Sequence, residues 1–434
     1  MQLVCERRSS FTTTLGCFVP AGSMHERLEE RGSALFLQHL FFERTVCKNQ
    51  EQLEVALQEI GGKVAAIAMR DMFLFYGTVP SHRIDKLVQF FADVILNGVI
   101  CDGDVRREKY MILHELGRME SDRERVVMDY LPTMAYQDTT LANSIYPTTV
   151  EVKNFSTESL NAFRSRLFQP CFMTMVCSGS ICLNDLGRTI NKYFPSETET
   201  QEPSSNVSNL TGYSAKPLEY RFSGAELRLR DDDEELGYVA VAVEGPGYEQ
   251  RDHRFALNVA KEIVGAWDRT CSGVNHNAPY IAHCAYNTEL CCMYRSFFHD
   301  WARTTSIWGC YYVCEKLMLE DMMFAIQQQW MRLCTTITQK EVSRAVNQCK
   351  TKELMILNDP LSRFLDIVKN LYRYRDYKPV DQRVAEYERI TADKIKEIAD
   401  KYIYDQSPAV IATGRIENLP DYCRIRSGMY LLRY

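Results

Sequence analysis

The sequence predicts an α+β protein built from two homologous domains in tandem. The chain of 434 residues is long enough for roughly two to four domains of ordinary size. A segment at the end of its first half is repeated at the end of its second half, and a polar stretch separates the halves. We therefore predict domains at residues 1–196 and 218–434, joined by a linker at residues 197–217.

The repeat aligns residues 156–181 with residues 391–416 without a gap. In both copies the apolar residues follow the i, i+3, i+7 spacing of one helix face. They occupy matching positions, which are Leu160, Phe163 and Leu167 in the first copy and Ile395, Ile398 and Tyr402 in the second. A β-rich run and a glycine come next in each copy. Each copy thus predicts a helix, a strand and a turn, with Ser156 or Thr391 as the helix N-cap.

The beginnings of the two halves are also similar to each other. Residues 12–19 alternate like a strand and lead through a glycine-bearing turn into a helix that contains residues 35–39. Residues 238–243 predict a strand that leads through a similar turn into a helix over residues 254–264. Ser, Thr, Glu, Asn and Pro dominate residues 196–213, which is a composition typical of a linker.

Composition excludes several classes of protein. The net charge of -6 and the lack of a Lys/Arg block argue against a nucleic-acid partner. The most apolar segment, residues 87–100, is interrupted by Asp93 and Asn97 and predicts a core helix. No apolar run reaches the ~18 residues of a transmembrane helix. Arg7 and Arg8 are too few for a transit peptide, so no presequence is visible.

The sixteen cysteines are scattered along the chain without any C-x-x-C pair. The closest spacings are the adjacent pair Cys291 and Cys292, and Cys310 followed four residues later by Cys314. A zinc ribbon needs two close pairs. We therefore expect buried free thiols in a reducing compartment.

The stretch Leu35-Phe36-Leu37-Gln38-His39 has the outline of an inverted zinc-peptidase helix, H-x-x-E-H. In that motif the two imidazoles share one helix face and bind the metal, and the glutamate takes a proton from the metal-bound water. Leu35 occupies the position of the first histidine, and its side chain has no lone pair to bind a metal. Gln38 stands at the glutamate and cannot accept a proton near neutral pH. We therefore predict that this chain has no catalytic residues.

A third ligand of such a site would come from a later helix. Residues 108–120 are helical in pattern, and Glu115 within them is a plausible distal ligand for the metal that His39 would bind. His114 is a poor substitute, because neighbouring helical residues point about 100° apart. Catalytic zinc usually needs three protein ligands, and Leu35 leaves at most two. We therefore predict no metal.

Two interpretations of His39 and Glu115 stay open. In the first, the two side chains hydrogen-bond each other or water inside an apolar pocket lined by Leu35. In the second, they keep part of a metal site. The loss of a ligand at Leu35 favours the first. The acidic run at residues 231–235 is another candidate cation site, although acidic runs are usually solvated turns.

Several long segments resemble the pitrilysin/insulinase family of metallopeptidases in its mitochondrial branch. This branch contains the β subunit of the processing peptidase and core protein I of respiratory complex III (ubiquinol–cytochrome c reductase). The resemblance covers nearly the whole chain. In the first half it includes residues 18–23, 31–45 and the glutamates Glu108 and Glu115. In the second half, segments more similar to core protein I than to the processing peptidase are residues 239–248, 321–335 and 421–429.

The resemblance implies that each half is a mainly antiparallel sheet backed by helices and that the halves enclose a cavity. Glu115 matches the family's distal zinc ligand, and Glu108 matches a glutamate that lies behind the metal ligands without binding the metal, so the resemblance implies that His39, Glu108 and Glu115 are vestigial metal-site positions. The resemblance further implies a non-catalytic scaffold without cofactors, peripheral on the matrix side of the mitochondrial inner membrane. Implied partners are a core protein II-like subunit, cytochrome b, cytochrome c1 and the iron–sulfur protein.

Two alternative functions follow from the same resemblance. The first is a zinc metalloendopeptidase, the β subunit of the mitochondrial processing peptidase, which would cleave presequences with zinc. The second is a partner that binds presequence peptides without cleaving them. The first requires a bound metal, and the second requires a peptide affinity that falls with salt, because acidic residues would meet basic peptides.

Overall fold

The computed structural model describes residues 1–194, 220–270 and 279–432, so the predicted linker at 197–217 lies outside the described residues. The chain divides into two compact units. Unit 1 comprises residues 1–118, 143–218 and 356–372, and unit 2 comprises residues 119–142, 219–355 and 373–434. Each unit holds one β-sheet and several helices, which confirms the predicted α+β class.

The two sheets share one strand order over five strands, and the sheet of unit 2 has one more strand at its edge. The sheet of unit 1 has the order β1-β5-β2-β4-β3, and its strands are β1 (Gln2–Arg7), β5 (Thr174–Gly179), β2 (Thr12–Val19), β4 (Phe73–Pro80) and β3 (Lys63–Ala68). The sheet of unit 2 has the order β6-β11-β7-β10-β9-β8. Its strands are β6 (Glu226–Arg230), β11 (Ala409–Gly414), β7 (Leu236–Pro246), β10 (Thr305–Glu315), β9 (Met293–His299) and β8 (Ala266–Asp268). Among the strands that the structure describes, only β1/β5 and β6/β11 pair in parallel, so the sheets are mainly antiparallel, as predicted.

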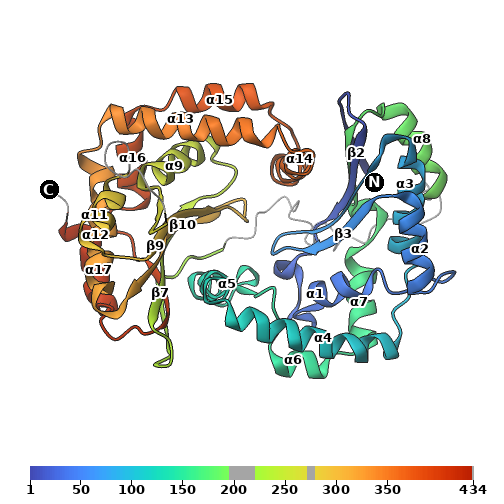
Figure 1. Ribbon diagram of the computed structural model, residues 1–434, viewed down its shortest axis with the longest axis horizontal. Coiled ribbons are helices and arrows are strands. Elements are labelled where there is room, and N and C mark those ends of the chain that lie inside the picture. The colour runs from blue at the N-terminus through green and yellow to red at the C-terminus, as the bar shows by residue number, and fades with distance from the viewer. Residues whose placement is uncertain (195–219, 271–278, 433–434) are drawn as a thin grey trace. The chain divides into compact units, whose positions relative to one another are not determined.

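One face of the sheet in unit 1 carries a helical layer (Figure 1). The helices of this unit are α1 (Ser33–Leu40), α2 (Gln50–Ile60), α3 (Ile84–Asn97), α4 (Asp102–Ser121, in this unit up to residue 118), α6 (Thr149–Asn154), α7 (Thr157–Leu167) and α8 (Leu183–Tyr193). Inward-facing residues of β2 and β4 join α3 and α7 in one apolar core. Burial of this apolar area is the main stabilising term.

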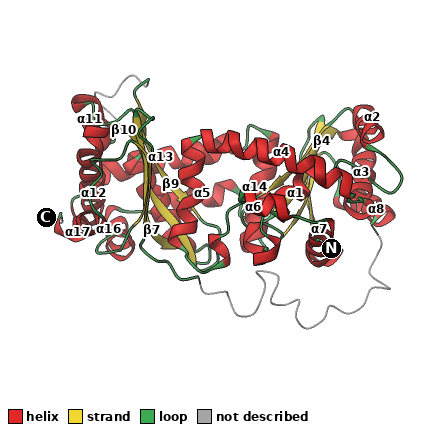
Figure 2. Cartoon of the chain, turned by 90° about the horizontal axis from the view of Figure 1, so that it is seen from below, coloured by secondary structure: helices red, strands yellow, loops and turns green. Residues whose placement is uncertain are grey.

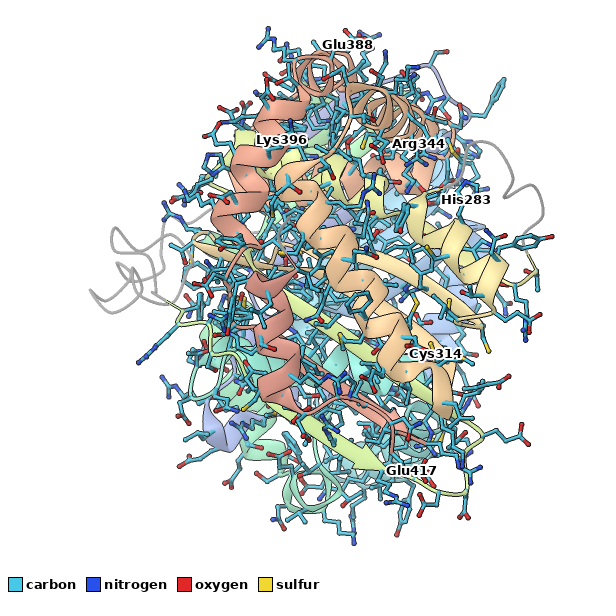
Figure 3. All side chains as sticks on the ribbon, turned by 90° about the vertical axis from the view of Figure 1, so that its left-hand side faces the viewer. His283, Cys314, Arg344, Glu388, Lys396 and Glu417 are labelled. Atoms are coloured by element: carbon cyan, nitrogen blue, oxygen red, sulfur yellow. The ribbon has the colours of Figure 1, made fainter. Side chains whose placement is uncertain are left out.

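A larger helical layer covers one face of the sheet in unit 2. It contains α9 (Arg251–Val264), α11 (Tyr280–Thr288), α12 (Leu319–Thr335), α13 (Gln339–Ile356), α15 (Val380–Glu388), α16 (Ala392–Tyr402) and α17 (Tyr422–Leu431). Figure 3 shows α12 and α16 side by side on this face, with Lys396 on α16. Trp308 of β10 and Trp330 of α12 are fully buried between the layers.

The second face of each sheet is covered by a helix from the other half of the sequence. The helix α5 (Arg123–Ala135) belongs to unit 2, where it packs on β7 and β11 (Figure 2). The helix α14 (Pro360–Tyr374) belongs to unit 1 up to residue 372, and its Phe364 is fully buried there. A sheet with two apolar faces needs cover on both. The units therefore exchange segments, while the boundaries at 196 and 218 stay a prediction.

The repeat found in the sequence is confirmed as a structural repeat. The helix of the first copy is α7 and that of the second is α16. Each is followed by a strand that lies second from the edge of its sheet, β5 after α7 and β11 after α16. The predicted N-caps are also correct. The Ser156 side chain accepts from the Ser159 N–H, and the Thr391 side chain accepts from the Lys394 N–H.

Two sequence predictions differ from the structure. The core helix predicted over residues 87–100 ends at Asn97, because Gly98 leaves the helix and bridges to Thr45. The expectation of buried thiols holds for Cys17 and others but is wrong for exposed cysteines such as Cys47, which lies in a loop. Among the described residues, no helix is long and apolar enough to cross a membrane.

Candidate functional site

The helix α1 carries the peptidase-like motif, and its start is fixed by two residues outside it. Gly32 precedes the helix with a φ of 86°, a left-handed conformation that favours glycine. The buried Glu26 carboxyl group accepts hydrogen bonds from the N–H groups of Gly32 and Ala34, both at 2.8 Å. These are amide groups that no helical carbonyl can satisfy. Glu26 therefore caps α1 from a distance.

Burial raises the pKa of Glu26 to about 8, although the two backbone hydrogen bonds oppose the shift. The ordinary value is 4.5, so between these pH values the folded state binds a proton that the unfolded chain has lost. The free energy of unfolding must then fall as the pH rises through this window, by up to about 1.4 kcal/mol per pH unit.

We expect Glu26→Gln to lower the free energy of unfolding by about 1–3 kcal/mol at pH 5.5, because the amide NH2 group then faces a backbone N–H donor. The variant lacks the titrating group, so its disadvantage should shrink as the pH approaches 8. Urea unfolding at pH 5.5 and at pH 8 measures both effects. The exposed Glu29→Gln is the matched control and should change little. A variant that loses stability between these pH values as steeply as the unaltered protein would contradict the prediction.

His39 lies between two carboxylates of α4. Its Nε2 is 3.0 Å from Glu115 Oε2, and its Nδ1 is 3.6 Å from Glu108 Oε2. The hydrogen bond with Glu115 raises the pKa of His39, and the charges of both glutamates raise it further. This arrangement suits an imidazolium that donates from Nε2 to Glu115 and has the Glu108 carboxylate near Nδ1, whereas a metal ligand needs a free lone pair. The His39–Glu115 hydrogen bond of the first interpretation is present.

Leu35 lies one turn before His39 on the same helix face and is 3% exposed. It belongs to an apolar cluster with residues from α1, α4 and the segment that follows α6, among them Phe36, Ile112, Leu116 and Phe155. A hydrocarbon therefore fills the place where the motif has its first imidazole. It offers no electron pair to a cation.

Gln38 uses its side-chain oxygen for structure. Its Oε1 accepts from the backbone N–H of Ala68, the last residue of the edge strand β3, at 2.7 Å. The bond ties α1 to the sheet of unit 1. An amide in this place cannot act as a general base.

An arginine that the sequence prediction missed completes the cluster. Arg107 of α4 forms an ion pair with Glu43 and lies 3.4 Å from Asp104 and 3.6 Å from Glu108. Burial raises the pKa of Glu43, and Arg107 opposes that shift. The i, i+3 spacing of Asp104 and Arg107 was a signal available in the sequence, but Glu43 lies in a loop that no helical pattern connects to α4.

The other candidates lie outside this cluster. His114 is exposed on α4 while Glu115 faces His39, as their angular separation predicted. The acidic run forms the turn between β6 and β7, where Arg123 contacts Asp231 and Glu234 at 2.8 Å. This run is a turn, as expected, and its Asp231, Asp232 and Glu234 side chains are paired with arginine.

The residues at this site do not fit the zinc that the motif would hold. Leu35 provides no ligand, and both nitrogens of His39 face carboxylates. Within residues 1–194, 220–270 and 279–432, no group of three or more His, Cys, Asp or Glu side chains is arranged to hold a metal. The cluster can act as a charge network that joins α1 to α4.

Comparison with known proteins decides the family. Residues 3–149 match the family model described as insulinase (peptidase family M16), and residues 154–349 match the model of the peptidase M16 inactive domain. The β subunit of the mitochondrial-processing peptidase of Rattus norvegicus is 31% identical over 99% of this chain and 86% of its own. The chain belongs to the insulinase family.

A second group of insulinase-family relatives is equally similar. Subunit 1 of the mitochondrial cytochrome b-c1 complex of Mus musculus is 32% identical over 100% of this chain and 88% of its own. A chain of complex III from Candida albicans matches with a TM-score of 0.84 and 21% identity, covering 99% of this chain and 97% of that one. This match shows the fold. Identity alone does not separate the two groups of relatives.

Proposed function

We propose that this insulinase-family protein is a non-catalytic core subunit of mitochondrial ubiquinol–cytochrome c reductase, similar to core protein I. One observation carries the proposal. Leu35 is buried in an apolar cluster and Gln38 is hydrogen-bonded to Ala68, so both catalytic positions have structural tasks. A zinc peptidase needs an imidazole and a carboxylate there.

The relatives support a respiratory complex as the setting. Subunit 1 of the cytochrome b-c1 complex covers the full length of this chain. We propose a core protein II-like subunit, cytochrome b, cytochrome c1 and the iron–sulfur protein as partners. The protein would lie on the matrix side of the mitochondrial inner membrane as a peripheral subunit.

The test is native-gel fractionation of mitochondria that express the tagged full chain. The proposal predicts that the chain co-migrates with cytochrome c1. Co-migration should survive Glu115→Gln, because that change alters the charge network and no catalytic step. Persistent migration as a free protein would overturn the proposal. Migration with the α subunit of the processing peptidase would replace it with the second candidate.

That second candidate is the zinc metalloendopeptidase, the β subunit of the mitochondrial processing peptidase. It is favoured by the 31% identity with the rat β subunit. It requires zinc, so the metal content of the purified chain separates the two functions. About 1 zinc per chain that disappears in His39→Ala would support the peptidase. A non-cleaving presequence binder would instead bind basic peptides without metal, more weakly as salt rises.

A further inference from the structure

Two cysteines face each other across the outermost strand pair of unit 1. Cys5 of β1 and Cys177 of β5 are register partners in the parallel ladder. Both side chains lie on the sheet face that carries the helical layer, where Cys177 is fully buried and Cys5 is half-buried. Cys5 is therefore the member of the pair that a small solute can approach.

The two thiols are in contact. The Cys177 side chain is close enough to the Cys5 thiol to lower its pKa, and the Cys5 thiol donates to the carbonyl oxygen of Ile181 at 3.4 Å. Paired strands lie about 4.8 Å apart, and disulfides join Cα atoms that are roughly 4.4–6.8 Å apart. The spacing of paired strands therefore falls within the Cα–Cα range of a disulfide.

We infer that Cys5 and Cys177 form a modification site that takes part in thiol–disulfide exchange with small disulfides such as glutathione disulfide. The Cys5 thiolate attacks one sulfur of the reagent, forms a mixed disulfide and releases one glutathione thiolate. The Cys177 thiolate then attacks the Cys5 sulfur and releases the second. The two protons pass to the departing thiolates, and the two electrons of the cysteine pair reduce the reagent to two molecules of glutathione.

The surroundings set the order of the two steps. The interaction with Cys177 lowers the pKa of Cys5, which favours the attacking thiolate there. The interaction with Cys5, and to a smaller extent burial, raise the pKa of the Cys177 thiol. The second step is therefore the slower one, and the mixed disulfide on Cys5 accumulates before the internal bond closes.

A disulfide between Cys5 and Cys177 would stabilise the position of the strand β1, to which α14 is bound. Glu6, next to Cys5, points to the other sheet face, where Arg363 of α14 binds it through Nε at 2.7 Å and 2.9 Å. The Ser178 hydroxyl, next to Cys177, donates to the same carboxylate at 2.7 Å. Within the described part of the chain, β1 lies at the edge of its sheet and pairs with β5 alone. A covalent link to β5 would therefore hold Glu6, and with it α14, more tightly on unit 1.

The test treats the purified full chain with glutathione disulfide at pH 7.5, blocks the remaining thiols, and maps linked peptides by mass spectrometry without reduction. We expect a peptide pair that joins Cys5 to Cys177, preceded in time by glutathione on Cys5. Cys5→Ser and Cys177→Ser should each abolish the linked pair. Cys5 that stays unmodified, or that stops at the mixed disulfide, would overturn the inference.

The chain provides matched controls. The exposed Cys47 and Cys423 should take up glutathione and show that the reagent is active. Cys291 and Cys314 also contact each other, but both are buried, so they should stay unlinked under the same conditions. If Cys291 links to Cys314 as readily as Cys5 links to Cys177, partial exposure of Cys5 does not select the site and the inference is overturned.

A second measurement tests whether the disulfide stabilises α14 on unit 1. Hydrogen exchange of residues 360–372 should slow by about tenfold in the oxidised protein, because a disulfide removes open states of the strand that holds them. Cys177→Ser under the same oxidation keeps β1 unlinked and should show no slowing. Equal exchange rates in the oxidised and reduced protein would refute the link between the bond and α14.

Discussion

Replacing Leu35 by histidine together with Gln38 by glutamate should give this chain a zinc site. Leu35→His places a second imidazole on the face of α1 that carries His39, and Gln38→Glu restores the carboxylate of the motif. Glu115 already lies 3.0 Å from His39 and can act as the third ligand. We expect about 1 zinc per chain by elemental analysis, against none in the unaltered protein. Without zinc, the imidazole introduced into the apolar cluster costs about 1–3 kcal/mol of stability, and added zinc should restore it.

The controls for this experiment isolate the metal site. The triple change Leu35→His, Gln38→Glu and His39→Ala should bind no zinc, because one imidazole is missing. In Gln38→Glu alone, a carboxylate oxygen can still accept the hydrogen bond from the Ala68 N–H. This variant should therefore keep the fold in the absence of zinc. Equal zinc content in the unaltered protein and the double variant would show that Leu35 and Gln38 are not what prevents binding.

Replacing Gly16 by valine should release α14 from unit 1. Gly16 lies in the middle of β2, and a side chain there would run into the ring of Phe364 and the carbonyl oxygen of Phe75. Phe364 is fully buried, so it cannot turn aside cheaply. We expect a loss of about 3 kcal/mol or more in the free energy of unfolding. Hydrogen exchange of residues 360–372 should rise by at least about tenfold, since 1.4 kcal/mol corresponds to that factor.

The matched control is Gly103→Ala on α4, where an added methyl group meets open space. Alanine in a helix is favoured over glycine by up to about 1 kcal/mol, so this variant should be neutral or slightly more stable. If Gly16→Val leaves the exchange of α14 unchanged, contact between this helix and β2 does not hold the helix in place.

Patterns between neighbouring residues were enough to predict much of the fold. The repeat was visible because α7 and α16 keep the same apolar spacing and the same type of N-cap, and both features act within a few residues. Prediction failed at Gly98, where the helix ends because the backbone pairs with Thr45, a residue far away in the sequence.

The candidate site was predictable in part for the same reason. The motif residues Leu35, Gln38 and His39 share one helix, and Glu115 could be placed by its own helical pattern. The distant cap Glu26, the bond from Ala68 to Gln38 and the pairing of Arg107 with Glu43 could not be predicted. Each joins elements whose relative placement follows from packing of the whole unit.

The sequence by itself determined which chemistry is missing, because in any conformation the alkyl group at Leu35 has no electron pair for a metal and the amide at Gln38 cannot accept a proton near neutral pH. Only the tertiary structure decided what these residues do instead, and that α5 and α14 each cover the sheet of the other half. Whether a side chain can bind a metal or accept a proton depends on that side chain alone. Which helix covers a sheet, and which distant residues pair, depends on how burial of apolar area brings together segments that are far apart in the sequence.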